Sequence, residues 1–294
     1  MQGSVAVRKF AVNGKAKPVA RRPSGRSLRY DVKRNGRASK KRAALRLRSG
    51  RRSAPDALAD VTSFLRPGDV INISGHDPWW QLWWQVPNAA IRGNQRRIFG
   101  AQSIWHDTHC ILYLDPQHTL SVQPWRARWL TAPDYCRKRI SIWRFTKHAV
   151  FPKEEIDLMM AYAQEHLIGQ VYDIGQLLDI LVNTILGYPN VIHYRIFDWG
   201  RSRKVCSVGV RVLFERLRQV LEDNGRPSFK PLFRKLNPTA PWPGGVFPQS
   251  RIPDQYGVDV ESTAPAHFAN SHYFDGEFEL VAVFDQGWRV YPLP

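Results

Sequence analysis

The chain has few cysteines and lacks any long apolar run. Its 294 residues include three cysteines, Cys110, Cys136 and Cys206, and no two of them have Cys-x-x-Cys spacing. So sparse and odd a set excludes a disulfide framework, predicts folding in a reducing compartment and argues against structural zinc. No run of about 18 apolar residues is present, so we expect no transmembrane segment. The first residues also lack an apolar core, so we expect no secretory signal peptide, and a location in the cytoplasm or inside a large assembly such as a virion.

Acidic residues are almost missing from the first 54 positions. There 18 Lys and Arg stand against one acid, Asp31, whereas the remaining residues carry 25 Lys and Arg against 24 acids. A segment so rich in Arg, Ser and Gly cannot build a core of its own, so residues 1–54 are predicted to form an extended basic arm. Such an arm binds nucleic acid or another polyanion through counterion release. A solvated tail or an organellar transit peptide has the same composition, and these alternatives stay open.

The pattern after the arm predicts an α+β domain, because strands come first, helices follow and a last strand closes the chain. We expect a core over residues 55–222, and a proline-rich segment over residues 223–294 that wraps the core and ends in a strand completing it. Alternation predicts strands at 70–74, 109–114, 119–123, 139–145 and 277–284. Apolar periodicity predicts helices at 60–65, 152–169, 174–186 and 206–221, and bulky residues recur at helical spacing over 78–84.

Four tryptophans, Trp79, Trp80, Trp83 and Trp84, are concentrated in that last stretch. They could line an acyl or glycan cleft, or rest on a membrane interface. A helix that packs its aromatic face on the sheet explains them equally well, so core packing and partner contact both stay open.

A cysteine and a histidine at the starts of two expected elements are the candidate catalytic residues. Cys206 opens a helix, whose N-terminus favours a thiolate, and His109 opens a strand, from which its imidazole could take the thiol proton. The residue that orients the imidazole should lie on the next strand, where Ser121 and Gln123 share a face. Gln123 is favoured because it reaches further, with Ser121 as the alternative. Taken singly, either member of the pair could instead be an ordinary core residue.

His106 and His109 could also suggest a metal site. The two would share one face of a helix but point in opposite directions on a strand. Since the strand is better supported, we expect no metal and no other cofactor.

Five short motifs extend the argument beyond the pair. In chain order they are Pro67-Gly68-Asp69, Thr108-His109, Tyr172-Asp173, Cys206-Ser207, and Ala264-Pro265 with the later Ser271. Together they span roughly residues 60–285 and resemble the circularly permuted branch of the NlpC-type, papain-like cysteine hydrolases, which includes the lecithin–retinol acyltransferases. The histidine precedes the cysteine, as permutation requires. The resemblance implies a papain-like antiparallel sheet packed against helices, with Cys206 as nucleophile and His109 as base. It also implies peptide-amide substrates, such as cell-wall cross-links, or lipid acyl groups.

Two functions follow from these features. The first is a cysteine hydrolase, an amidase, peptidase or acyl hydrolase that the basic arm anchors to a polyanion or a large assembly. The second is a non-catalytic structural or nucleic-acid-binding component of a large assembly such as a virion. The Cys206–His109 pair favours the first, the charge of the arm favours the second, and a lytic enzyme carried in a virion would combine them.

Overall fold

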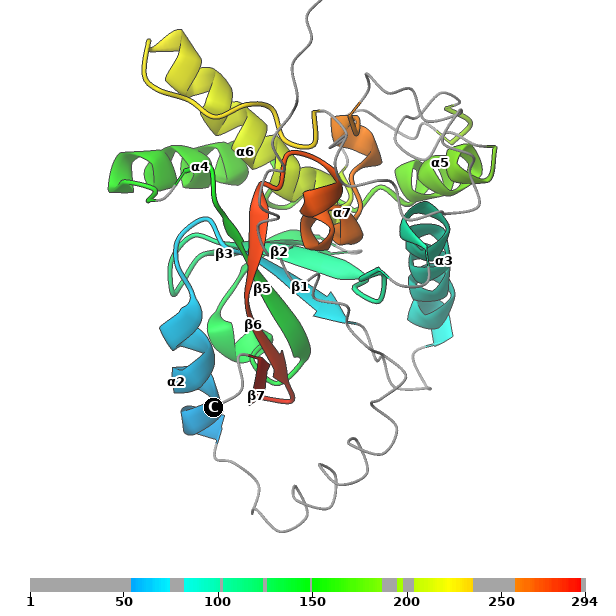
Figure 1. Ribbon diagram of the computed structural model, residues 1–294, viewed down its shortest axis with the longest axis horizontal. Coiled ribbons are helices and arrows are strands. Elements are labelled where there is room, and N and C mark those ends of the chain that lie inside the picture. The colour runs from blue at the N-terminus through cyan, green and yellow to red at the C-terminus, as the bar shows by residue number, and fades with distance from the viewer. Residues whose placement is uncertain are drawn as a thin grey trace, which may run out of the picture. The chain divides into compact units, whose positions relative to one another are not determined.

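A computed structural model describes most of the chain after the basic arm (Figure 1). The described residues are 54–74, 82–100, 103–123, 126–148, 150–186, 195–197, 204–234 and 257–291. Residues 1–53, Trp79, Trp80 and much of the proline-rich segment lie outside them. Trp83 and Trp84 lie in a helix, but their side chains are not described, so the role of the tryptophans stays a prediction.

The core of the fold is a seven-stranded sheet with the order β4-β3-β2-β1-β5-β6-β7. Every neighbouring pair is antiparallel. The strands are β1 (Val70–Ser74), β2 (His109–Tyr113), β3 (Thr119–Val122), β4 (Ala127–Leu130), β5 (Arg139–Phe145), β6 (Phe278–Asp285) and β7 (Trp288–Tyr291). The antiparallel sheet with helices around it confirms the predicted α+β class.

Six helices accompany the sheet in the described residues. They are α2 (Ala54–Phe64), α3 (Leu82–Phe99), α4 (Lys153–His166), α5 (Ile174–Ile185), α6 (Cys206–Asp223) and α7 (Pro265–Ala269). The helices expected after residue 150 are confirmed to within a turn. The sequence did not predict β4, β7, α7 or the length of α3, and it began α2 several residues too late. No helix among the described residues is long and apolar enough to cross a membrane.

Both faces of the sheet are covered, because alternate residues of β2 enter two separate apolar clusters. Cys110 and Leu112 join the cluster that contains α4, α6 and α7, whereas Ile111 and Tyr113 join the cluster that contains α2. Figure 1 shows α6 and α2 on different sides of strands β2 and β3. The first cluster is the larger, and it holds both Cys110 and Cys206.

The Pro-Gly-Asp motif is a turn that fixes the start of β1. Gly68 has a φ of +87°, and a Cβ there would lie 2.3 Å from a ring carbon of Phe151, so only glycine fits. Asp69 is buried, accepts the backbone N–H of Arg66 at 2.8 Å and pairs with Arg144 on β5 at 2.8 Å. Burial raises the pKa of Asp69, and the hydrogen bond from Arg144 opposes that rise. The turn therefore ties β1 to β5 and positions the strand that pairs with β2.

Candidate active site

Helix α6 starts at Cys206 and is fastened at that end to a segment far along the chain. Ser207 donates its hydroxyl to the carbonyl of Thr263 at 2.5 Å, and Arg211 donates to the Thr263 hydroxyl at 3.0 Å. The backbone N–H groups of a first helical turn have no carbonyl one turn earlier to bind, and the helix dipole is positive there. The nucleophile candidate thus lies where backbone dipoles favour negative charge.

Gly209 lets α6 approach the sheet closely, one turn beyond the cysteine. A Cβ at this position would lie 2.7 Å from Cγ2 of Val122 on β3, which is closer than carbon atoms pack. The helix start is therefore set against the end of β3 by the absence of a side chain.

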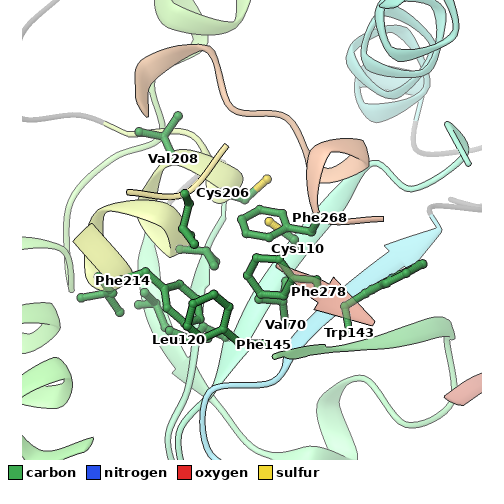
Figure 2. Close-up of a cluster of buried hydrophobic side chains, with 14 of the residues drawn as sticks. Val70, Cys110, Leu120, Trp143, Phe145, Cys206, Val208, Phe214, Phe268 and Phe278 are labelled. Carbon is green, nitrogen blue, oxygen red and sulfur yellow. The ribbon is translucent and has the colours of Figure 1, made fainter. Parts of the chain in front are cut away.

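Two groups on β2 act on the Cys206 sulfur. A hydrogen bond from the Cys110 thiol is the largest cause that lowers the pKa of Cys206 well below its usual value, and the charge and hydrogen bond of His109 lower it further, although burial opposes them. Burial raises the pKa of Cys110, with the hydrogen bond to Cys206 as a second cause. Figure 2 shows the sulfur atoms of Cys206 and Cys110 next to each other. These opposite pKa shifts favour the thiolate form of Cys206 and the thiol form of Cys110.

The imidazole of His109 is held by Ser121 on the neighbouring strand. Its Nε2 lies 2.9 Å from the Ser121 hydroxyl oxygen, and Ser121 is fully buried. Gln123, which the sequence favoured on reach alone, follows the last residue of β3, and no hydrogen bond in the described part of the chain joins it to His109. Ser121, the alternative that the sequence offered, is therefore the residue that contacts the imidazole in this geometry.

Tyr172 adds a third polar contact to the Cys206 sulfur, which the sequence did not predict. The residue is buried, and burial raises the pKa of its hydroxyl, as do the charge of Cys206 and a hydrogen bond to it. A hydroxyl that keeps its proton can donate to a thiolate. Tyr172 forms a parallel bridge with Lys204, two residues before the cysteine. The sequence contains Tyr172 in the Tyr-Asp motif, but the motif alone does not show that its hydroxyl contacts Cys206.

The second residue of that motif begins α5 and helps to position α6. Asp173 caps α5 by accepting the backbone N–H of Gln176 at 2.8 Å. The Gln176 side chain in turn accepts the N–H of Val205 at 3.4 Å and donates to the carbonyl of Glu261 at 3.0 Å. One side-chain amide thus links the starts of α5 and α6 to the segment near residue 261.

A small, mainly apolar cavity of about 20 Å³ opens beside Cys206, with room for little more than a water molecule. Its walls come from α3, α5 and the segment 263–265. Asn94 on α3 lines it, and its Oδ1 is buried and has no hydrogen-bond partner among the described residues. The sulfur is therefore buried in the fold and still accessible to a small reagent.

His106 is not part of this group. It precedes β2, is exposed, and its ring lies over that of Trp105 with centroids 3.8 Å apart. Within the described ranges, no group of three His, Cys, Asp or Glu side chains could hold a metal ion.

Comparisons of the chain with models of known families, with curated proteins and with solved structures give no match.

Proposed function

We propose that the protein is a cysteine hydrolase of papain-like architecture, with Cys206 as nucleophile and His109 as general base. One observation carries the proposal: Cys206 begins a helix, and its pKa is lowered by Cys110 and by His109. A buried thiol without such partners would have a raised pKa. A thiolate at a helix start beside an imidazole is the arrangement that thiol catalysis requires.

In the proposed reaction the Cys206 sulfur attacks the carbonyl carbon of an amide, ester or thioester. The carbon–sulfur bond forms, the bond to the leaving group breaks, and His109 passes the proton it took from the thiol to that leaving group. Water then attacks the acyl–cysteine, His109 takes the water's proton, and the carboxylic acid leaves as the Cys206 sulfur is released. The backbone N–H of Cys206 donates to the oxyanion in both steps. No step needs a cofactor.

The surrounding residues have supporting roles in this reaction. Ser121 keeps the His109 ring in one orientation, which is the role of the third residue in a catalytic triad. Cys110 and Tyr172 hydrogen-bond to the sulfur and stabilise the resting thiolate. The cavity walls are mainly apolar, which suits the apolar part of an acyl or peptide substrate, but the cavity must widen to admit one. Amides and acyl esters are both retained as substrates.

A burst assay with p-nitrophenyl esters of increasing acyl length, followed by peptide amides, tests the proposal. We expect one equivalent of nitrophenolate per chain, together with an acyl group on Cys206 that mass spectrometry detects. Cys206→Ala should abolish the burst, His109→Ala should slow it strongly, and Cys136→Ala should leave it intact. An undiminished burst in Cys206→Ala would contradict the proposal.

We propose further that residues 1–54 anchor the enzyme to nucleic acid or another polyanion. The support is their charge of 18 Lys and Arg against one acid, which predicts binding that weakens steeply with salt. Deleting residues 1–54 should remove salt-dependent DNA binding, and DNA binding retained after that deletion would refute this role. If instead the full chain binds DNA and Cys206 never forms an acyl intermediate, the non-catalytic alternative is supported.

A further inference from the structure

The nucleophile candidate has a second thiol beside it that hydrolysis does not consume. Cys110 comes from β2 and Cys206 from the first turn of α6, and the two side chains lie in one apolar cluster. Their sulfur atoms are neighbours in Figure 2, and each thiol shifts the pKa of the other. A stabilising thiol need not be cysteine, because a serine or threonine hydroxyl donates a stronger hydrogen bond. Two neighbouring sulfurs can also form a covalent bond with each other, which hydroxyl groups cannot.

The two sulfurs differ in how a reagent could reach them. Cys206 lines the small cavity, whereas Cys110 is fully buried and does not line it. A cavity of about 20 Å³ admits a molecule not much larger than water. Hydrogen peroxide, with two oxygen atoms, is such a molecule, and it would meet Cys206 first.

We propose that Cys110 and Cys206 form a reversible disulfide, in which a peroxide oxidises Cys206 and Cys110 then displaces the oxidised oxygen. The inference rests on the proposed function for its consequence, because a disulfide would switch the hydrolase off. The formation of the bond itself requires only the two neighbouring sulfurs and the peroxide.

The steps balance. The Cys206 thiolate attacks one oxygen of the peroxide, the oxygen–oxygen bond breaks, and the sulfur becomes a sulfenic acid while hydroxide leaves and is protonated to water. The Cys110 sulfur then attacks the Cys206 sulfur, the sulfur–oxygen bond breaks, and a second water leaves with the Cys110 proton. Two thiols and one peroxide yield one disulfide and two waters.

The pKa directions fit this order of events. The thiolate is the form that reacts with peroxide, and the pKa of Cys206 is the lowered one of the pair. Burial is the largest cause that raises the pKa of Cys110, and the negative charge of Cys206 raises it further, so oxidation of Cys206 to the neutral sulfenic acid removes one of these causes. A neighbouring thiol traps the sulfenic acid before a second peroxide can carry it to the irreversible sulfinic acid.

Cys136 provides a control within the same chain. It lies in the other apolar cluster, across the sheet, and its Sγ contacts the carbonyl of Pro133 at 3.8 Å. It is a buried thiol like Cys110 and has no sulfur neighbour among the described residues.

The test is peptide mass spectrometry of the full chain after treatment with equimolar hydrogen peroxide and blocking of the remaining thiols. We expect a Cys110–Cys206 cross-linked peptide that disappears with dithiothreitol, in wild type and in Cys136→Ser alike. In Cys110→Ser we expect Cys206 sulfinic acid, which dithiothreitol does not reverse. Wild-type chains whose Cys206 is over-oxidised while Cys110 stays free to label would overturn the proposal, and this result needs no folded variant.

This readout separates the proposal from the proposed function. A Cys110–Cys206 cross-link without an acyl intermediate would contradict the proposed hydrolase function and support the disulfide. An acyl intermediate without a cross-link would support the hydrolase function and contradict the disulfide.

Discussion

Replacing Gly209 by alanine should destabilise the protein even though alanine favours helices. The new Cβ would lie 2.7 Å from Cγ2 of Val122, a stiff side chain in a packed core. Overpacking of this kind lowers the free energy of unfolding by ~1–3 kcal/mol, whereas the higher helix propensity of alanine over glycine raises it by ~1 kcal/mol. The expected net loss is therefore up to about 2 kcal/mol in the free energy of unfolding. The same strain should push the start of α6 away from β3 and slow acylation of Cys206.

Urea unfolding followed by circular dichroism measures this effect, and a double-mutant cycle with Val122→Ala isolates its cause. Val122→Ala alone removes two methyl groups and should cost about 2 kcal/mol. In the double variant the alanine methyl at position 209 takes up part of the vacated space, so the combined loss should fall short of the sum by at least about 1 kcal/mol. Gly93→Ala in α3 is the matched control, because an added Cβ there would meet no described atom within 4 Å outside its own helix, and it should stabilise the helix. Additive losses in the cycle would refute the close approach.

Three further results are expected from single substitutions. Ser121→Ala should slow acylation of Cys206 at about pH 6 by roughly two- to tenfold, the worth of one hydrogen bond, whereas Gln123→Ala should not; equal effects would contradict the geometry. Burial raises the pKa of Glu277 to about 7, so the stability it contributes at low pH is lost as pH rises through that value. The free energy of unfolding of Glu277→Gln, relative to wild type, should therefore be about 2–3 kcal/mol higher at pH ~8 than at pH ~5, as measured by urea unfolding. A difference from wild type that does not depend on pH would contradict the raised pKa of Glu277. Asp69→Ala should lower the free energy of unfolding by about 3 kcal/mol, because its arginine partner loses its counter-charge, and a loss below about 1 kcal/mol would refute the ion pair's role.

The sheet strands with strong alternation could be predicted from sequence, and those without it could not. β1 and β5 were predicted residue for residue, because each alternates between two apolar clusters. β4 has only four residues, of which Arg128 is exposed, so its alternation is too short to stand out. The second half of α3 is rich in polar side chains such as Arg96 and Arg97, so its apolar stripe is narrow.

The candidate site was predictable in its chain positions and not in its contacts. Extending the register in which Leu112 pairs with Leu120 places Gln123 opposite His109. Ser121 is then opposite Ile111, two residue pairs away but on the same face as Gln123. The length of its side chain favoured Gln123, but β3 ends before this residue, and the buried diagonal neighbour Ser121 makes the hydrogen bond. Contacts between β2 and α6 depend on tertiary packing, which local periodicity does not report.

The ultraviolet absorbance of the thiolate as a function of pH, wild type minus Cys206→Ser, tests the central claim most directly, since it needs no reagent to enter the cavity. We expect Cys206 to be ionised well below the range of an ordinary thiol, whose pKa is about 8.5. In His109→Ala its pKa should rise, because the charge and hydrogen bond of the imidazole are gone. A Cys206 that ionises at or above the ordinary value, or a pKa that His109→Ala leaves unmoved, would contradict the account.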